Sequence, residues 1–172
     1  MRLDDLGREF DEFVRSASTR LLRVAYLLTG DYGHAEDLLQ TALLRTARRW
    51  HKARAQPEAY ARRVLTNLAK DRWRDRSRRP VEVGRLLEPG HDSSSGQVLL
   101  RHTLLPAVLQ LPIRQRAVLV LRYFEDLSVD ETAAALGCSA GTVKSQTHHA
   151  LARLRDLLGE DTLHTEEADH AH

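Results

Sequence analysis

The sequence of 172 residues has a single cysteine, Cys138. An internal disulfide and a metal site built on cysteine pairs are therefore excluded. The longest apolar runs, such as residues 117–121, are far shorter than the roughly 18 residues that a membrane span needs. The first residues also lack an apolar stretch, so we expect no secretory signal, no membrane insertion and a cytoplasmic protein.

The chain as a whole has little net charge, because it contains 26 basic and 24 acidic side chains, which gives +2. The charges are nevertheless distributed unevenly. Residues 45–79 hold 13 Lys or Arg and three acids, which gives +10, whereas residues 159–172 hold five acids and no Lys or Arg. A strongly basic segment of this kind points to a polyanion as its partner.

Strand-like alternation is missing, and helical periodicity dominates the first half of the chain. Apolar residues recur every three or four positions over 10–28, which predicts a long helix that stops at Gly30. Asp31 is placed to cap a second helix over 33–50, and a third helix over 57–77 begins with a proline in its first turn. Three helices of this size form a small bundle.

Composition changes after the third helix. Eight of the nineteen residues in 80–98 are Gly, Pro or Ser, which indicates a flexible linker with an extended reach of up to about 60 Å. Helical patterns then return near residues 99–110, 113–124, 129–136 and 140–158. The prediction is all-α: two small helical domains joined by the linker and followed by an acidic tail without regular structure, with bounds 1–79, 80–98, 99–158 and 159–172.

Residues 128–154 have the pattern of a helix-turn-helix motif. Ser128 and Glu131 form a capping-box pattern, Gly137 permits a sharp turn, and Ser139 can cap the following helix. The second helix of this motif enters the major groove of DNA. Its expected exposed side chains carry donors for phosphates and base edges: Thr142, Lys144, Ser145, Gln146, His148, His149 and Arg153. An ordinary helical hairpin is the alternative, and the polar outer face favours DNA binding.

The sequence gives little support for metal binding, a reactive thiol or catalysis. His148 and His149 are adjacent on a helix and point in different directions, so they make a poor chelating pair. Cys138 lies in a turn and suits a packing role. We see no clustered acids, metal-ligand spacing or nucleophile–base pairing beside the basic segment. We therefore expect no metal, no cofactor and no enzymatic activity.

The third helix has a basic face as well as an apolar one. Arg63, Asn67, Lys70 and Arg74 follow one another at steps of four, three and four, and Trp73 extends this stripe. Cations track phosphates, an aromatic ring offers stacking, and an amide can hydrogen-bond a base edge, so the stripe suits a nucleic acid strand. The alternative is a solvated charged face with Trp73 packed inside, and the helix-turn-helix downstream favours the nucleic acid.

The second helix has an unusual outer face, made of Asp37, Gln40, Thr41 and Leu44. An acid, an amide and an exposed leucine together fit a protein-docking surface with one apolar anchor. From these residues alone, a plain solvated face is the stronger interpretation.

Three stretches in the same order resemble the bacterial RNA polymerase sigma factors, specifically the small two-domain extracytoplasmic-function (ECF) group. The first is similar to that family's core-polymerase-binding signature: HAEDLLQTALLRTARRW. The second is similar to its helix for the −10 promoter element: AYARRVLTNLAKDRWRDRSRR. The third is similar to its fourth domain, which reads the −35 element: LQLPIRQRAVLVLRYFEDLSVDETAAALGCSAGTVKSQTHHALARLR. The resemblance covers about residues 8–158, and the pattern is most similar to an actinobacterial, SigE-like subgroup.

The resemblance implies a role for each face. Asp37 and Gln40, with Leu44 as a neighbour, would contact the β′ clamp helices of core RNA polymerase. The −10 residues would be Tyr60, Arg63, Asn67, Lys70 and Arg74, with Asn67 lining the pocket for a flipped-out base. The exposed side chains of the helix-turn-helix would bind the −35 element. The partners implied are core polymerase, including its β subunit, promoter DNA and, in some members, an anti-sigma factor.

Two departures from the family limit what the resemblance implies. Related recognition helices often carry a stronger donor where His149 stands, and a neutral imidazole attracts phosphate less strongly. No second tryptophan stands beside Trp73, so the paired aromatics that help primary sigma factors melt DNA are missing. The main alternative function is a stand-alone helix-turn-helix regulator, which explains residues 128–154 but leaves the second and third helices without a role.

Overall fold

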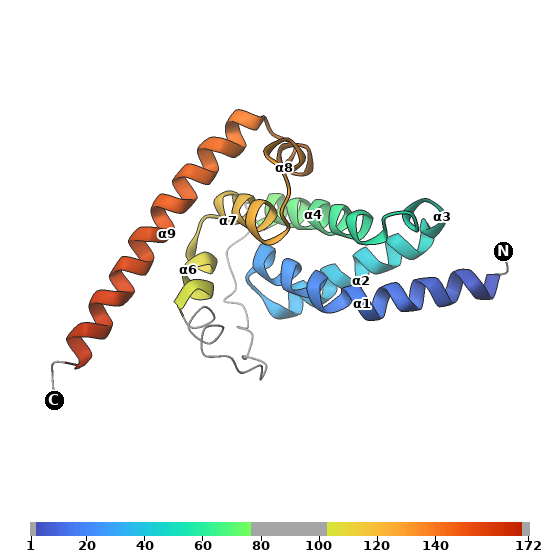
Figure 1. Cartoon of the computed structure of the whole chain (residues 1–172), viewed down its shortest axis with the longest axis horizontal. Helices are drawn as coiled ribbons and strands as arrows, with labels where there is room; N and C mark the ends of the chain where they lie inside the picture. Colours follow the sequence, from blue (N-terminus) through green and yellow to red (C-terminus); the bar gives the residue numbers. More distant parts are fainter. Residues whose placement is uncertain (1–2, 77–102, 170–172) are drawn as a thin grey trace. The chain divides into compact units, whose positions relative to one another are not determined.

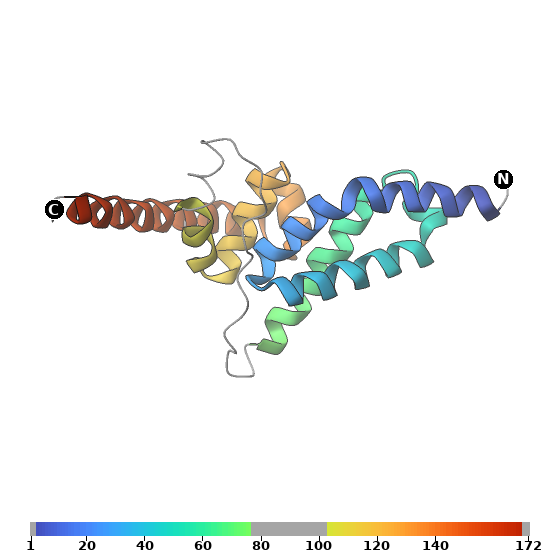
Figure 2. The ribbon, with the colours of Figure 1, turned by 90° about the horizontal axis from the view of Figure 1, so that it is seen from below.

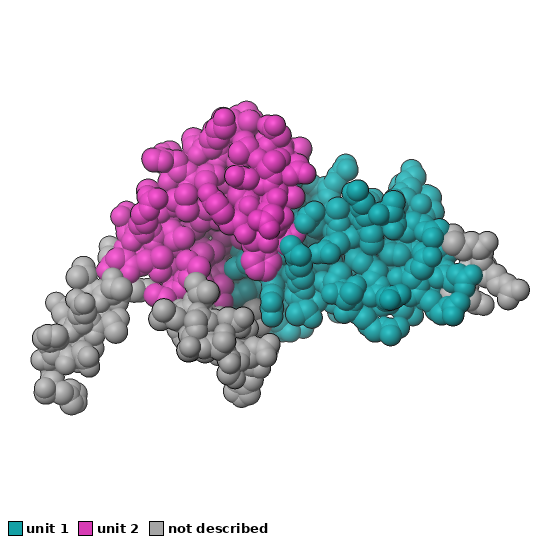
Figure 3. Space-filling view, viewed as in Figure 1, with its two compact units in different colours: residues 1–87, 135–137 teal, residues 88–134, 138–172 magenta. Residues whose placement is uncertain are grey.

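The structure is a computed structural model that describes residues 3–76 and 103–169. The elements in these two stretches are helical and include no strand, which confirms the all-α prediction. Contacts within the chain divide it into two compact units, one built from the helices before residue 77 and one from most of the helices after residue 102 (Figure 3). The predicted linker over 80–98 lies outside the described residues.

Three long helices and one short helix form the first unit: α1 (Leu3–Thr29), α2 (Tyr32–Arg48), α3 (Trp50–Ala53) and α4 (Pro57–Arg76). The long helices α1, α2 and α4 all pack against one another, which makes the predicted bundle (Figures 1 and 2). As predicted, α4 begins at Pro57, because a proline in the first turn gives up no helical hydrogen bond.

The turn between α1 and α2 follows the local chemistry of its residues. Gly30 adopts a φ of +72°, a conformation that glycine reaches without steric cost, and its N–H bonds to the Tyr26 carbonyl at 2.7 Å. The Asp31 carboxylate then accepts a hydrogen bond from the His34 backbone N–H at 2.8 Å and caps α2. Such a cap contributes about 1 kcal/mol. Both predicted signals are confirmed.

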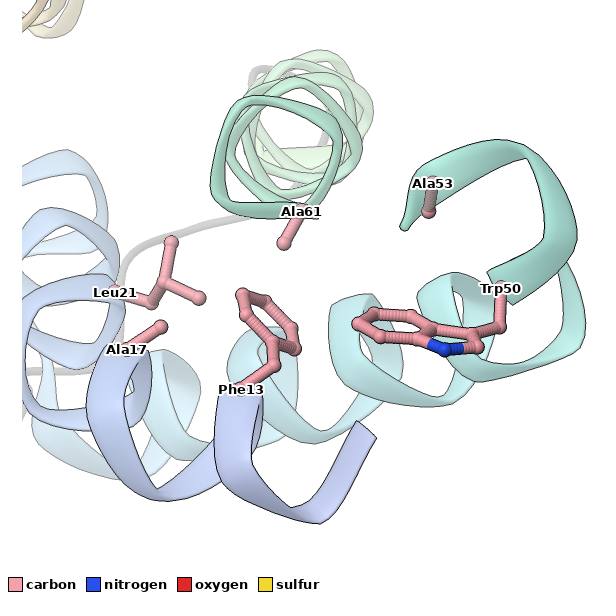
Figure 4. Packing of buried hydrophobic residues seen from close by; sticks show 6 residues of the cluster. All are labelled: Phe13, Ala17, Leu21, Trp50, Ala53 and Ala61. Atoms are coloured by element: carbon pink, nitrogen blue, oxygen red, sulfur yellow. The ribbon is translucent and has the colours of Figure 1, made fainter. Parts of the chain in front are cut away.

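Aromatic packing joins α3 to α1 in the core of the bundle. Phe13, Ala17 and Leu21 of α1 face Trp50 and Ala53 of α3 and Ala61 of α4 (Figure 4). Trp50 lies edge-on to the Phe10 ring at a centroid distance of 5.1 Å, and 5.6 Å from the Phe13 ring. Aromatic pairs of this kind contribute about 0.5–1.5 kcal/mol each beyond their buried area.

The end of the second helix differs from the prediction. The predicted helix over 33–50 includes Trp50, whereas α2 ends at Arg48 and Trp50 opens the separate helix α3. The Arg49 N–H bonds to the Thr46 carbonyl at 3.1 Å, a tighter pattern that changes the direction of the chain. The change buries the Trp50 ring, a gain that periodicity alone does not reveal.

Five elements form the described part of the second half: α6 (Leu105–Gln110), α7 (Ile113–Leu119), η2 (Val120–Phe124), α8 (Val129–Leu136) and α9 (Ala140–Asp169). Leu111 and Leu119 pack with Ala150 of α9, and half-buried leucines of α9 extend this core. As predicted, Pro112 separates two helices, because the residue before a proline is forced into extended backbone.

The predicted helix over 113–124 is α-helical only to Leu119 and then widens into the π-helical turn η2. The Glu125 N–H bonds to the Val120 carbonyl at 3.0 Å, five residues back. The Arg122 guanidinium donates to the Leu127 carbonyl, so the loop after η2 is held close to it. Periodicity does not distinguish such a turn from regular helix.

The prediction of an irregular acidic tail is wrong for most of its length. The last helix was expected to end at residue 158, whereas α9 continues to Asp169. Gly159 lies inside the helix, where a glycine costs only about 1 kcal/mol relative to alanine, and no proline follows it. Within the described ranges, none of the helices is both long enough and apolar enough to span a membrane.

Candidate nucleic-acid and protein-docking surfaces

The helix-turn-helix is built as its capping residues predict. Ser128 and Glu131 exchange hydrogen bonds of 2.7 and 3.1 Å at the start of α8, which completes the capping box. Gly137 takes a φ of +67° in the turn, and the Ser139 hydroxyl accepts the Thr142 N–H at 3.1 Å to cap α9. Local chemistry therefore fixes both ends of the motif.

The face of α9 opposite its core carries the predicted DNA contacts. Val143 and Ala150 are fully buried and fix the orientation of the helix. Of the predicted −35 side chains, Gln146 is half-buried and the others are exposed: Thr142, Lys144, Ser145, His148, His149 and Arg153. These residues form one polar surface, which we call the α9 surface. Its position opposite the buried anchors matches the recognition helix of a helix-turn-helix.

Two members of the α9 surface already have local partners. The Ser145 hydroxyl donates to the Thr142 carbonyl at 3.1 Å, and the Thr142 and Ser139 hydroxyls lie 2.9 Å apart. The rings of His148 and His149 lie 5.9 Å apart and at 61° to each other, consistent with their pointing in different directions. The described residues contain no group of three or more His, Cys, Asp or Glu side chains that could hold a metal ion.

The outer face of α2 exposes the predicted docking residues. Asp37 and Gln40 are exposed, and Leu44 is 60% exposed, although it is a large apolar side chain. On the inner face, Ala35, Leu38, Ala42 and Thr46 are buried. We call Asp37, Gln40 and Leu44 the α2 docking face. This face therefore combines one exposed apolar side chain with an acid and an amide, a mixture that a protein-docking surface can use.

The start of α2 carries a shifted pKa. The Glu36 carboxylate raises the pKa of the Tyr32 hydroxyl above its usual value of 10, mainly by its charge and also by accepting a hydrogen bond from it. Tyr32 therefore stays uncharged throughout the neutral pH range, and the negative charge beside it belongs to Glu36.

A hollow of about 440 Å³ lies between the end of α2 and the middle of α4. Two predicted −10 residues line it, Tyr60 and Asn67, together with Val64. The opposite wall consists of three exposed arginines: Arg45, Arg48 and Arg49. We call this feature the α2–α4 hollow. It combines a half-buried aromatic ring, an amide and concentrated positive charge, which is the composition of a single-strand binding site.

The other residues of the predicted −10 face do not line the hollow. Arg63 and Arg74 are exposed on α4, and Arg74 lies 3.7 Å from the Asp71 carboxylate. Trp73 is half-buried, and its indole N–H donates to the Leu28 carbonyl at 3.3 Å. The packed alternative is therefore the correct one for Trp73. The structure gathers only part of the predicted stripe.

Sequence reasoning missed the three arginines of the hollow as site residues. They belong to the basic segment over 45–79, but the prediction assigned them no face. The available signal was their spacing, because residues three and four positions apart lie on the same side of a helix. Their proximity to Tyr60 and Asn67 depends on how α2 packs on α4, and one sequence does not show that.

Comparisons with known proteins agree with the two units. Residues 13–79 match the family model described as Sigma-70 region 2, and residues 101–154 match Sigma-70, region 4. An RNA polymerase sigma-E factor from Streptomyces coelicolor is 46% identical over 152 residues, which cover 87% of this chain and 86% of that protein. The ECF RNA polymerase sigma factor SigM from Mycobacterium tuberculosis is 33% identical, with 87% and 77% covered.

A solved structure shares the fold. The sigma factor RpoE, in its co-crystal with the anti-sigma factor NepR from Bartonella quintana, aligns with a TM-score of 0.67. It is 24% identical, and the alignment covers 88% of this chain and 98% of that one. The two family models and the curated relatives above show that the chain belongs to the extracytoplasmic-function RNA polymerase sigma factors. Its function is that of a sigma factor in promoter-directed transcription initiation, which rules out the stand-alone regulator.

Proposed function

We propose that this sigma factor binds core RNA polymerase through the α2 docking face. The observation that carries the proposal is the exposure of Leu44 at 60% in an otherwise well-packed bundle, with Asp37 and Gln40 exposed on the same face. Burial of the exposed Leu44 side chain by a partner is favourable, and hydrogen bonds to the acid and the amide would orient that partner. The resemblance to the family assigns this contact to the β′ clamp helices.

The α9 surface is proposed to read the −35 element in duplex DNA. Its buried anchors, Val143 and Ala150, hold the helix so that the polar side chains face outward. Lys144 and Arg153 supply positive charge for phosphates, and Gln146 supplies an amide for a base edge. The hydroxyls of Thr142 and Ser145 are partly used within the helix, so the longer side chains carry more of the recognition.

The α2–α4 hollow is proposed to accept one unstacked base of the −10 element. Tyr60 offers an aromatic ring to the base, and the Asn67 amide can pair with its edge. Stacking of this kind contributes about 1–3 kcal/mol per base, which offsets part of the cost of melting the duplex. Arg63, Lys70 and Arg74 extend positive charge along the rest of α4 and would follow the strand.

The chain is proposed to catalyse no reaction of its own. Core polymerase supplies the chemistry, and the sigma factor supplies promoter recognition and strand capture. Its place of action is then the cytoplasm, where polymerase and DNA are found. An anti-sigma factor is a further proposed partner, because the structurally similar RpoE was solved in a complex with one.

Reconstituted transcription tests this proposal. Core polymerase is mixed with the chain and with fragments of actinobacterial genomic DNA, and the transcribed fragments are amplified and assayed singly by run-off transcription. The proposal predicts transcripts from selected fragments that core polymerase alone does not make. If the chain co-elutes with core polymerase and no fragment is transcribed above the level of core alone, the proposed roles of α4 and α9 are wrong.

A further inference from the structure

Three arginines of the α2–α4 hollow have no acidic partner among the residues that the structure describes. Arg45, Arg48 and Arg49 are exposed, and none of them forms an ion pair or hydrogen bond through its side chain there. Other arginines of the same unit do have acidic partners: Arg8 with Asp5, Arg20 with Glu58, Arg54 with Glu9 and Arg74 with Asp71. Three arginines without an acidic partner among the described residues therefore lie together on one wall of this hollow.

Helix geometry brings these three side chains together. Arg45 and Arg48 lie in the last turn of α2, and Arg49 is its C-cap residue. Arg48 and Arg49 lie three and four positions after Arg45, on its side of the helix, and all three line the hollow. Cations at the C-terminus of a helix also complement its dipole by about 0.3–1 kcal/mol, so the helix tolerates the repulsion among them.

The opposite wall has a different chemistry. Tyr60 and Val64 are half-buried and present apolar surface, and Asn67 adds one exposed amide. A site with a cationic wall and an apolar wall matches a nucleotide, which joins an anionic phosphate to a flat base. The volume of about 440 Å³ is in the range of small-ligand sites and far too small for a duplex.

We propose that Arg45, Arg48 and Arg49 bind the backbone phosphates that flank the base held in the hollow. This inference rests on the proposed function and adds positioning residues to it. A guanidinium group binds a phosphate through two parallel hydrogen bonds, so three of them fix the path of the strand as well as its affinity. The ligand is single-stranded rather than double-stranded DNA, because a base reaches the Tyr60 wall only when it has left the stack.

Helix α2 carries both the docking face and the arginines of the hollow. Leu44 belongs to the α2 docking face, and the arginines that follow it line the hollow. The strand is then held by the same rigid helix that docks on polymerase, so its path is fixed relative to the enzyme. An acidic segment of a partner protein would also be attracted to the arginines, but it would leave the aromatic wall and Asn67 unused.

Salt dependence tests the inference in the complete holoenzyme. The full chain is assembled with core polymerase, and its affinity for fluorescent single strands of about 15 nucleotides is measured against salt concentration for oligo-dA, oligo-dC and oligo-dT. Each phosphate contact contributes about 0.7 to the slope of log affinity against log salt for single strands. The combined variant Arg45→Ala, Arg48→Ala and Arg49→Ala is expected to lower the slope by about 2.

Matched variants separate this role from a general loss of charge. Arg15 is exposed on α1 and lies outside the hollow, so Arg15→Ala is expected to leave the slope within about 0.2 of wild type. Arg48→Lys is expected to keep most of the slope that Arg48→Gln loses, because it retains the charge. Asn67→Ala is expected to weaken the preference among the three oligonucleotides without changing the slope.

The outcomes distinguish the inference from the proposed function. A slope lowered by about 2 in the triple variant, with core binding at the wild-type level, supports the inference. An unchanged slope, with a base preference that still depends on Asn67, overturns the inference and leaves the proposed function standing. Loss of core binding in the folded triple variant also overturns it, since the arginines would then face a protein. If the wild-type holoenzyme binds single strands no better than core alone, the proposed function itself fails.

Discussion

Leu44 and Arg45 are neighbours in the chain but belong to two different surfaces of the same helix. Leu44 is exposed on the α2 docking face, whereas Arg45 lines the α2–α4 hollow. Successive residues on a helix point about 100° apart, so α2 can present both surfaces at once. Polymerase docking and strand capture should therefore be separable by single substitutions that leave the bundle intact.

Asn67→Ala should impair the formation of open complexes and leave core binding nearly unchanged. Among the described residues that line the hollow, Asn67 has the only side-chain amide, and a lost base contact of about 1.4 kcal/mol corresponds to a tenfold effect. The rate of open-complex formation can be followed with a fluorescent base analogue in the −10 region of a selected promoter. Equal losses of core binding and of melting would indicate misfolding and would contradict the role of Asn67.

Lys144→Ala should weaken binding of the holoenzyme to promoter DNA and lower its salt dependence. Lys144 is exposed on the α9 surface, and one lost phosphate contact on duplex DNA reduces the slope by about 0.9. Filter binding or fluorescence anisotropy at several salt concentrations measures the slope. Arg114 on α7 is exposed outside this surface, so Arg114→Ala is the matched control. Equal slopes for wild type and Lys144→Ala would remove Lys144 from the phosphate contacts.

His149→Arg should strengthen duplex binding and raise the salt slope by about 0.9 near pH 7.5. An imidazole in water is mostly uncharged at that pH, whereas a guanidinium is always charged. The comparison is Gln110→Arg, which adds the same charge on α6 outside the α9 surface. A gain of equal size in both variants would show a general charge effect and would contradict a specific position for His149.

Trp50→Ala should destabilise the first unit by about 3–5 kcal/mol, because the ring is buried against Phe10 and Phe13. Urea denaturation followed by far-UV circular dichroism measures the change. Leu44→Ala, at an exposed site, should change stability by less than about 0.5 kcal/mol. If the two substitutions cost the same, α3 does not close the bundle in solution.

Local chemistry explains why much of the fold is predictable from the sequence. Asp31, Ser128 and Ser139 each make the predicted capping hydrogen bond, because a cap depends on residues only three positions apart. Gly30 and Gly137 take positive φ values at the predicted helix ends for the same reason. The exposed faces of α2 and α9 also follow from periodicity, which assigns inner and outer positions directly.

Features that depend on tertiary packing were missed or wrongly predicted. Trp50 leaves the predicted second helix because its ring fits between Phe10 and Phe13, which lie about forty residues earlier in the chain. The α2–α4 hollow exists only because α2 packs against α4. Its arginines were therefore included in the basic segment but were assigned to no binding site. The extension of α9 past residue 158 was missed because the polar, acidic composition of residues 159–172 was interpreted as a tail without regular structure.

Binding to core polymerase is the central claim, and gel filtration with purified bacterial core polymerase tests it most directly. The wild-type chain should co-elute with core polymerase. Asp37→Arg, which reverses a charge on the α2 docking face, should lower the affinity at least about tenfold. Glu12→Arg makes the same charge change at an exposed site on α1 and should co-elute like wild type. Co-elution of folded Asp37→Arg at the wild-type level, or failure of the folded wild type to bind, would contradict this account.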